Sequence, residues 1–196
     1  MKKTIKKSKN IIQNTKKNIT DAACQLFSKF SYLGVSMSDI AERLNITKAA
    51  LYYHFSGKKE IYKKVLDSIF NDLSSSIAQA LNENTIDKKL RKLIKNYLNF
   101  GLKEKNFIRA LILKLSPSDK QITKHIAQSR KRITALIQPV IEEALRSKKL
   151  TKKIDANLLT SLFIGIMDGL LLEYSFLNKK INLAKIPDQI IAIFFS

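Results

Sequence analysis

Residues 48–54 have the types and the spacing of a helix that enters a nucleic-acid groove. If Leu51 faces a core, the outward positions of this helix form two rows. The rows are Lys48 with Tyr52, and Ala49 with Tyr53. The alanines keep the helix slender where it must enter a major groove, and a methyl group can touch the methyl of thymine. Thr47 precedes the helix, where free backbone N–H groups suit a phosphate. The pattern predicts a surface that contacts DNA.

Patterns for catalysis or metal binding do not assemble in this sequence. His54 and His125 are the only histidines, and no His-Glu-x-x-His spacing is present. Cys24 is the single cysteine, which rules out an intramolecular disulfide and a cysteine-based metal site, so we expect it to be a packing residue. Neither a phosphate-binding loop nor a Gly-x-Gly-x-x-Gly run occurs. We therefore expect no enzyme activity, no metal and no cofactor.

The charge of the chain favours a polyanionic partner. Its 196 residues carry 36 Lys and Arg against 16 Asp and Glu, a formal charge of +20. Thirty of the basic residues are lysines and six are arginines, a skew that an AT-rich coding sequence also produces. Residues 1–64 hold 14 basic and 4 acidic residues, or +10, and the other 132 residues share the remaining +10. Codon bias does not account for this concentration of charge in the first third.

Helical periodicity runs through the chain. Five glycines and three prolines are few, which favours long helices with few loops. Apolar residues recur at i, i+3 and i+4, and the alternation typical of strands is missing. We predict an all-α fold of about nine helices, beginning near residues 15, 37, 48, 58, 90, 107, 119, 155 and 187. Pro117-Ser118-Asp119 opens the seventh helix, which we expect to kink at Pro139, and Pro187 opens the last.

Two of these helices are short and closely spaced. Ser36 can cap the helix over 37–44, and Thr47 can cap the helix over 48–54. Asn45 lies between them and tolerates the left-handed conformation that a sharp turn requires. Residues 36–55 therefore predict a helix-turn-helix motif within a DNA-binding domain over 15–60. Residues 1–14, rich in lysine, predict a basic flexible arm that is solvated and does not read a groove.

Residues 19–69 resemble the DNA-binding domain of the tetracycline-repressor (TetR/AcrR) family of bacterial transcription regulators. The resemblance is carried by Ala22-Ala23-x-x-Leu26-Phe27, by Asp39-Ile40-Ala41-x-x-Leu44-Asn45-Ile46-Thr47 and by Ala50-Leu51-Tyr52-Tyr53-His54-Phe55-x-x-Lys58-x-x-Ile61. About 50 residues align without a gap, and the run Leu-Tyr-Tyr-His-Phe followed by Lys is highly specific for this family. Ser31 departs from the pattern, standing where a glycine usually ends the first helix, and Val35 stands where a threonine usually precedes the second.

The resemblance implies sequence-specific binding to double-stranded DNA, with His54 contacting the backbone. Lys58 suits a second phosphate, and the serines near Val35 can replace the contact that this valine removes. Arg43 is the only arginine before residue 91, so we expect DNA shape, lysine and tyrosine to carry specificity. The predicted DNA-binding residues are Ser36, Ser38, Thr47, Lys48, Ala49, Ala50, Tyr52, Tyr53, His54 and Lys58.

Residues 61–196 match that family only in being helical, of the right length and rich in apolar helices. The resemblance implies a helical effector-binding and dimerisation domain, and a repressor that an unknown small molecule releases from a pseudo-palindromic operator. The helices over 155–176 and 187–195 would form the homodimer interface, with Gly165 and Gly169 in it. Asp168 and Glu173 on the same helix are either exposed rim charges or polar anchors in a ligand pocket, and we favour the rim charge. The predicted pocket lining is Phe100, Phe107, Leu111, Phe163 and Met167.

The apolar stretch over 156–167 is short of the roughly 20 residues that cross a bilayer, so we expect no membrane partner and a cytoplasmic location. Two alternatives stay open. The first is a helical enzyme or adaptor whose basic surface is incidental, which a gel shift at physiological salt would separate. The second is a nonspecific DNA-packaging protein, which competition with random-sequence DNA would reveal.

Overall fold

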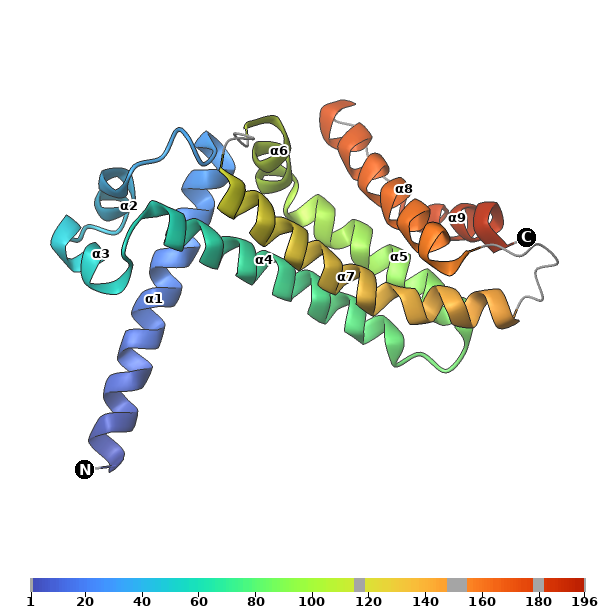
Figure 1. Cartoon of the computed structure of the whole chain (residues 1–196), viewed down its shortest axis with the longest axis horizontal. Coiled ribbons are helices and arrows are strands. Elements are labelled where there is room, and N and C mark those ends of the chain that lie inside the picture. Colours follow the sequence, from blue (N-terminus) through green and yellow to red (C-terminus); the bar gives the residue numbers. More distant parts are fainter. Residues whose placement is uncertain (1, 115–118, 148–154, 178–181, 196) are drawn as a thin grey trace. The chain divides into compact units, whose positions relative to one another are not determined.

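The computed structural model of the chain describes residues 2–114, 119–147, 155–177 and 182–195, and it contains no strand in these ranges. The predicted all-α class is confirmed, and the helices follow the predicted order (Figure 1). In the described ranges they are α1 (Lys2–Phe30), α2 (Met37–Arg43), α3 (Lys48–His54), α4 (Lys58–Leu81), α5 (Ile86–Lys103), α6 (Lys105–Lys114), α7 (Lys120–Ser147), α8 (Ala156–Leu177) and α9 (Ile186–Phe195).

The helices form two compact units. Unit 1 comprises Met1–Ser68 and Asn106–His125, and unit 2 comprises Ile69–Lys105 and Ile126–Ser196. The predicted boundary at residue 60 falls inside the first turn of α4, and unit 1 also takes in α6 and the start of α7. Sequence reasoning assigned those later segments to the second domain because they follow it along the chain, whereas packing groups them with the first.

The first helix begins earlier than the sequence predicts. Residues 2–14, expected as a flexible arm, continue α1 as helical backbone. Neither Pro nor Gly interrupts the stretch from 2 to 30, so no residue in it would end a helix. Core packing starts only at Ile19, which is 1% exposed. The N-terminal half of α1 is therefore a helix without a buried face over residues 12–18.

Apolar side chains from α1 to α4 make the core of unit 1. Ile19, Ala23 and Phe27 of α1 are at most 1% exposed, and Ile40, Leu51 and Ile61 of the next three helices are fully buried. An aromatic cluster extends this core: the Tyr62 ring lies edge-on to Phe27 with centroids 4.9 Å apart. Tyr62 also lies 6.0 Å from Phe107 of α6. Burial raises the pKa of Tyr62, as expected for a phenol held inside a core.

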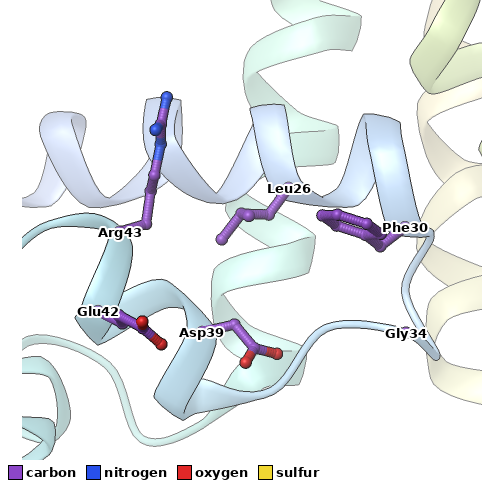
Figure 2. A pocket seen from close by; sticks show the side chains of 6 residues that line it. All are labelled: Leu26, Phe30, Gly34, Asp39, Glu42 and Arg43. Atoms are coloured by element: carbon purple, nitrogen blue, oxygen red, sulfur yellow. The ribbon is translucent and has the colours of Figure 1, made fainter.

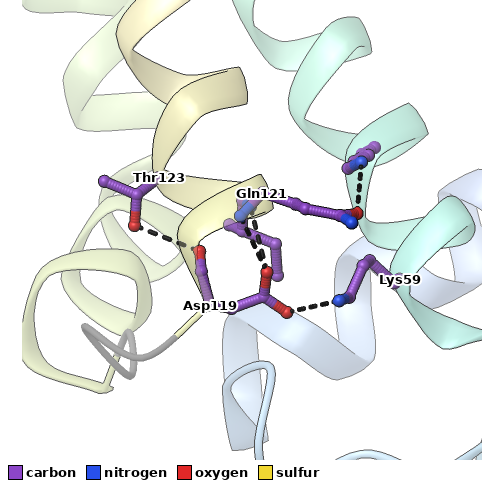
Figure 3. Close-up of polar contacts among 6 residues, drawn as sticks. Lys59, Asp119, Gln121 and Thr123 are labelled. Atoms are coloured by element: carbon purple, nitrogen blue, oxygen red, sulfur yellow. Dashed lines mark hydrogen bonds and ion pairs between the residues drawn. The ribbon is translucent and has the colours of Figure 1, made fainter.

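The start of α7 joins unit 1 through polar contacts (Figure 3). Asp119 caps α7, since its Oδ1 accepts from the backbone N–H groups of Gln121 (3.1 Å) and Ile122 (3.2 Å). The same carboxylate pairs through Oδ2 with Lys59 Nζ of α4 at 2.9 Å, and this bond holds the pKa of Asp119 below its usual range. Pro117 and Ser118, predicted to open this helix, lie outside the described residues. α7 continues through Pro139, and the predicted kink there stays a prediction.

Unit 2 contains α5, α8, α9 and the later parts of α4 and α7, and all of them contribute to its core. α5 packs against both α8 and α9, and its buried residues include Leu90, Leu93 and Leu98. Gly101 of α5 allows the closest approach, because a Cβ at this position would lie 2.1 Å from a methyl of Leu171 in α8. Phe163 and Met167 of α8 are fully buried in the same core. The two predicted helices at the end of the chain thus contribute side chains to the core of this unit.

α8 matches the helix predicted over 155–176 and is apolar along most of its length. Residues Ala156–Phe176 are long and apolar enough to cross a membrane by length and composition, a test that core helices of soluble proteins also pass. The sequence reading stopped this stretch at Met167 because Asp168 follows. The structure explains the carboxylate: Asp168 accepts from Tyr97 Oη and from Arg130 Nη2, both at 2.6 Å. Asp168 is thus a paired group, which corrects its reading as an exposed rim charge.

Candidate nucleic-acid interface

A capping box fixes the start of α2. The Ser36 hydroxyl accepts from the backbone N–H of Asp39 at 3.2 Å, and the Asp39 carboxylate accepts from the backbone N–H of Ser36 at 2.7 Å. The hydrogen bond from Ser36 lowers the pKa of Asp39, which stays ionised and satisfies the first turn. The predicted cap at Ser36 is confirmed. Its hydroxyl oxygen is already an acceptor, and its proton remains to be donated to a phosphate.

The turn between α2 and α3 depends on one left-handed residue. Asn45 has φ 53°, as predicted, and Ile46 N–H then donates to the carbonyl of Ala41 at 3.0 Å. Thr47 caps α3, because its hydroxyl accepts from Ala50 N–H at 3.1 Å. These bonds set the angle at which α3 leaves α2. The predicted helix-turn-helix is therefore built from the local signals that the sequence carries.

The core side of α3 is narrow. Leu51 is fully buried and Phe55, the residue that ends the helix, is 2% exposed. The five residues on the other side of the helix are exposed, and they form what we call the α3 outer face: Lys48, Ala49, Ala50, Tyr52 and Tyr53. Tyr52 is 52% exposed and Tyr53 is 79% exposed. These exposures exclude the interpretation of the two tyrosines as core residues, since neither ring is buried.

The α3 outer face carries a positive charge and no negative charge. The sequence of α3 contains no Asp or Glu, and Lys48 lies at its first turn. The His54 ring is half-buried and lies edge-on to the Tyr53 ring, with centroids 5.1 Å apart. Asp39 of α2 is close enough to Lys48 and Lys58 for both lysines to favour its charged form, after the larger effect of Ser36. The face and the adjacent His54 thus offer amine, phenol, methyl and imidazole groups to a ligand.

Lys58 has a structural partner that sequence reasoning missed. Its Nζ donates to the backbone carbonyl of Tyr32 at 2.8 Å and lies 4.4 Å from the centroid of the Tyr32 ring. Burial lowers the pKa of Lys58 and the nearby Asp39 opposes that shift. An ammonium group has three donors, so a phosphate contact remains available. Lys58 therefore ties the loop after α1 to the start of α4, beside the predicted contact.

The loop between α1 and α2 contains the two residues that depart from the family pattern, and they have different structural roles. Ser31, where the resemblance implies a glycine, takes the left-handed conformation, with φ 66° and 3% exposure. Its backbone N–H closes α1 by donating to Phe27 at 2.9 Å. Val35 is 2% exposed, so the side chain that replaces a threonine joins the core. The serines of α2 remain the hydroxyl groups nearest to this position along the chain.

Two shallow hollows flank the loop. One, of about 430 Å³, lies between α1 and α2 (Figure 2) and is lined by Leu26, Phe30, Gly34, Asp39, Glu42 and Arg43. The other, of about 500 Å³, is lined by Leu33, Gly34, Val35, Ser36, Met37, Asp39, Tyr52 and Lys58. The second hollow brings together Ser36, Tyr52 and Lys58 from three helices or their caps. These three predicted DNA-binding residues therefore share one surface.

A second capping interaction fixes the start of α4. Glu60 Oε2 accepts from both the backbone N–H and the hydroxyl of Ser56, each at 2.7 Å. The backbone hydrogen bond is the main cause of the lowered pKa of Glu60. The sequence signal for this contact was a serine followed by an acidic residue one turn later, next to the Ser56-Gly57 break. The turn between α3 and α4 is thus as firmly specified as the turn before it.

The residues predicted outside the helix-turn-helix are divided between the units. Phe107 is buried in the aromatic cluster of unit 1, and half-buried Leu111 belongs to unit 1 as well. Phe100, Phe163 and Met167 pack in the core of unit 2. The predicted pocket therefore stays a prediction. Gly165 and Gly169 are exposed, and a Cβ built on either would meet no atom of this chain within 4 Å.

Comparisons with known proteins cover the chain from residue 19 onward. Residues 19–65 match "Bacterial regulatory proteins, tetR family", and residues 62–196 match "YsiA-like protein, C-terminal region". A negative regulator of the icaADBC biofilm operon, IcaR of Staphylococcus epidermidis, is 46% identical over 56 residues, which are 29% of this chain and 30% of that protein. The matched segment thus spans about a third of the length of this relative.

Solved structures share the fold over most of their length. The fatty acid degradation regulator FadR from Bacillus halodurans has a TM-score of 0.80 at 16% identity, covering 92% of this chain and 94% of its own. FadR from Bacillus subtilis, solved in complex with stearoyl-CoA, has a TM-score of 0.78 at 17% identity, covering 91% and 96%. At these identities the likeness establishes the arrangement of helices and nothing about the ligand.

Proposed function

We propose, because this chain belongs to the tetR family of bacterial regulatory proteins, that it is a repressor of transcription that binds an operator through α3. The protein acts in the cytoplasm as a homodimer on a pseudo-palindromic operator. A small molecule bound by unit 2 releases it from the operator. The observation that carries the proposal is the α3 outer face, which presents two exposed tyrosines and a lysine on a helix held by caps at both of its turns.

Within this interface we assign two kinds of contact. Lys48 and Tyr53 lie on the outward rows of α3 and suit contacts to base edges. Thr47, His54 and Lys58 flank that face and suit phosphates. Arg43 donates to Gln25 at 3.0 Å, so it is held on α1. Direct readout then depends on few groups, and DNA shape contributes the rest of the specificity.

The homodimer is supported by the exposed apolar side chains of α8 and α9. Leu158, Leu162 and Phe176 of α8 are each about half exposed, at 56%, 50% and 48%, and Ile193 of α9 is 71% exposed. Gly165 and Gly169 lie on the same exposed side of α8 with open space above them. An apolar surface with small residues permits close approach of a second copy. Two copies would place two α3 helices on half-sites about 34 Å apart, or slightly more.

For the effector we propose a long-chain acyl-CoA. The body of this chain matches the YsiA-like C-terminal region over 62–196, and the B. subtilis regulator of the same fold was solved with stearoyl-CoA. Phe163 and Met167 are fully buried and would have to move to admit an acyl chain, a change for which methionine is well suited. Bound effector must then weaken DNA binding by the same factor by which bound DNA weakens effector binding, because the coupling is reciprocal.

The DNA-binding proposal is tested by selecting duplexes from a random-sequence library with the purified chain, then measuring binding by fluorescence anisotropy at physiological salt. We expect a pseudo-palindrome that binds at least about 1,000-fold more tightly than random duplex. Tyr53→Phe and Lys48→Ala should each change the selected sequence, whereas Lys131→Ala, an exposed lysine of unit 2, should not. Equal affinity for selected and random DNA would support the packaging alternative and contradict the proposal.

The effector proposal is tested by calorimetric titration of stearoyl-CoA into the free protein and into its complex with the selected duplex. We expect weaker binding to the complex, by a coupling of about 1–3 kcal/mol. Sedimentation of the free protein at micromolar concentration tests the dimer, and Leu162→Lys should shift it toward monomer. Equal stearoyl-CoA affinity in both titrations would exclude acyl-CoA as the releasing ligand, while the DNA-binding proposal would stand.

A further inference from the structure

The first 18 residues carry a concentration of charge that the helix-turn-helix does not use. Residues 2–18 contain seven lysines and no acidic residue, and the first acidic residue of the chain is Asp21. Their backbone is helical throughout as the N-terminal half of α1. From Ile12 to Asn18 every side chain is exposed except Thr15, which is half-buried. The segment is therefore a basic helix, and its described side chains before Ile19 are outside the core of unit 1.

The described part of this helix before Ile19, residues 12–18, has no buried side chain. Most helical stability comes from packing of an apolar face, and isolated helices of this length are marginal in water. The lysine pairs Lys2 with Lys6 and Lys3 with Lys7 stand at i, i+4, where like charges repel. Lys17 pairs with Asp21 at 2.9 Å, the one acidic group at this end of the chain. A polyanion that neutralises the remaining lysines would remove the repulsion and favour the helix.

The position of residues 2–18 beside α3 favours DNA as the polyanion that they bind. Lys16 Nζ lies 5.3 Å from the ring centroid of Phe55, the residue that ends α3. Within unit 1, α1 thus passes the end of α3 at Lys16, and Figure 1 shows α1 running on past α2 and α3. At 1.5 Å per residue, the stretch from Lys2 to Lys16 is about 21 Å long. DNA carries one phosphate per roughly 1.7 Å of its axis, so this length of duplex holds about a dozen phosphates.

We propose that residues 2–18 form a helical clamp that binds the phosphates of DNA beside the site contacted by α3, without reading bases. The inference rests on the proposed function, because it takes the same duplex as its ligand. Lysine suits this role as a mobile point charge, whereas base readout by a helix would need groups with fixed hydrogen-bond geometry. The segment adds affinity and salt dependence to every DNA sequence equally, and α3 supplies the discrimination between sequences.

The test compares two variants with the same change in charge. The first carries Lys2→Gln, Lys3→Gln, Lys6→Gln and Lys7→Gln, and glutamine preserves helix propensity. The control carries Lys88→Gln, Lys95→Gln, Lys131→Gln and Lys185→Gln, four exposed lysines of unit 2. Affinity is measured between 50 and 300 mM salt for the duplex selected by the wild-type protein and for a 40-base-pair random duplex. Amide hydrogen exchange over residues 2–18 is followed with and without each duplex.

We expect the first variant to bind both duplexes at least about tenfold more weakly at 0.1 M salt, with the ratio between the duplexes unchanged. The slope of log affinity against log salt should fall by about 0.9 for each phosphate that the variant no longer neutralises, and the control should keep the wild-type slope. DNA should protect the amides of residues 2–18 in the wild-type protein. If no duplex is preferred by the wild-type protein, the proposed function fails, and the slope on random DNA still tests the clamp.

Three results would overturn the clamp. The first is a salt slope for the Lys2–Lys7 variant equal to that of the control on both duplexes. The second is a changed sequence preference in that variant, which would mean that the segment reads bases. The third is protection of residues 2–18 by phosphatidylglycerol vesicles with none by DNA, which would assign the segment to a lipid surface.

Discussion

Unit 1 and unit 2 both have an apolar core and capped helices, but they differ in the length of their helices and in how these helices meet. In unit 1 the short helices α2 and α3 begin at side-chain caps, Ser36 and Thr47, and meet at the left-handed Asn45. In unit 2 the long helices α5 and α8 meet through a continuous apolar core, and the half-buried Asp168 of α8 pairs with Tyr97 of α5. Hydrogen bonds are directional, so the caps fix the angle between neighbouring helices, whereas apolar packing mainly keeps the helices in contact. The unit that must present α3 to DNA therefore relies on hydrogen bonds near its surface.

The glycines sharpen this contrast. A Cβ at Gly34 would lie 2.4 Å from the backbone oxygen of Phe30, and a Cβ at Gly101 would lie 2.1 Å from the Leu171 side chain. The obstacle in unit 1 is backbone that cannot give way, and the obstacle in unit 2 is a side chain that can rotate. Gly165 of α8 meets no obstacle within the chain. The same residue type thus marks a rigid loop, an adaptable helix contact and an open surface.

The largest expected effect separates the cores of the two units. Phe55→Ala in unit 1 and Phe163→Ala in unit 2 should each lower the free energy of unfolding by about 3–5 kcal/mol, because each empties a fully packed site. Phe55→Ala should abolish DNA binding in anisotropy assays while sedimentation still shows the dimer. If the Phe55→Ala variant sediments as a monomer, then dimerisation depends on unit 1 as well as on unit 2.

The next effect tests the rigid loop. Gly34→Ala should lower the free energy of unfolding by about 1–3 kcal/mol, since its methyl group collides with backbone. Gly57→Ala is the matched control, because a Cβ there meets nothing within 4 Å, and it should be neutral or slightly stabilising. Chemical denaturation of both variants measures the difference. Equal stability of the two variants would contradict the close approach of Gly34 to Phe30.

A smaller effect distinguishes the two lysines that flank α3. Lys58→Ala should cost about 1–2 kcal/mol of stability, because it removes the hydrogen bond to the Tyr32 carbonyl and the contact with the Tyr32 ring. Lys48→Ala should leave stability within about 0.5 kcal/mol of wild type and change the preferred DNA sequence. Thermal denaturation and duplex selection are measured on the same preparations. Altered sequence preference with unchanged stability in Lys58→Ala would reverse the assignment.

The smallest effect concerns acid. The pKa of Asp119 lies below its ordinary 3.8, chiefly through the bond to Lys59, so its ionised form stabilises unit 1 above that pH and the contribution disappears as pH falls through the lowered value. Asp119→Asn should lower the melting temperature slightly at pH 7, by an amount that corresponds to less than about 1 kcal/mol. The difference in melting temperature between the variant and wild type should become smaller as the pH falls from 3.8 toward 2.5. A difference that persists undiminished at pH 2.5 would assign the effect to packing.

Much of unit 1 could be predicted from the sequence because its signals are local. Ser36, Asn45 and Thr47 act on residues within one turn of themselves, so their types and spacing are enough to indicate caps and a turn. The outward rows of α3 followed from one assumption, that Leu51 is buried, and both tyrosines are exposed as that assumption requires. The start of α1 was missed because lysine-rich sequence gives neither a helix stop nor an apolar stripe.

The partners of residues distant in the sequence were decided by the tertiary structure. Lys58 meets a carbonyl 26 positions away, Asp119 meets Lys59, and Asp168 meets Tyr97, and no local spacing announces such pairs. Phe107 was assigned by sequence to a ligand pocket, yet packing places it against Tyr62 in unit 1. The sequence by itself determined the helices, their caps and the exposed face of α3, since these depend on periodicity and short-range hydrogen bonds. Only folding determined which charges are paired and which apolar residues share a core, because those contacts depend on how separate helices meet.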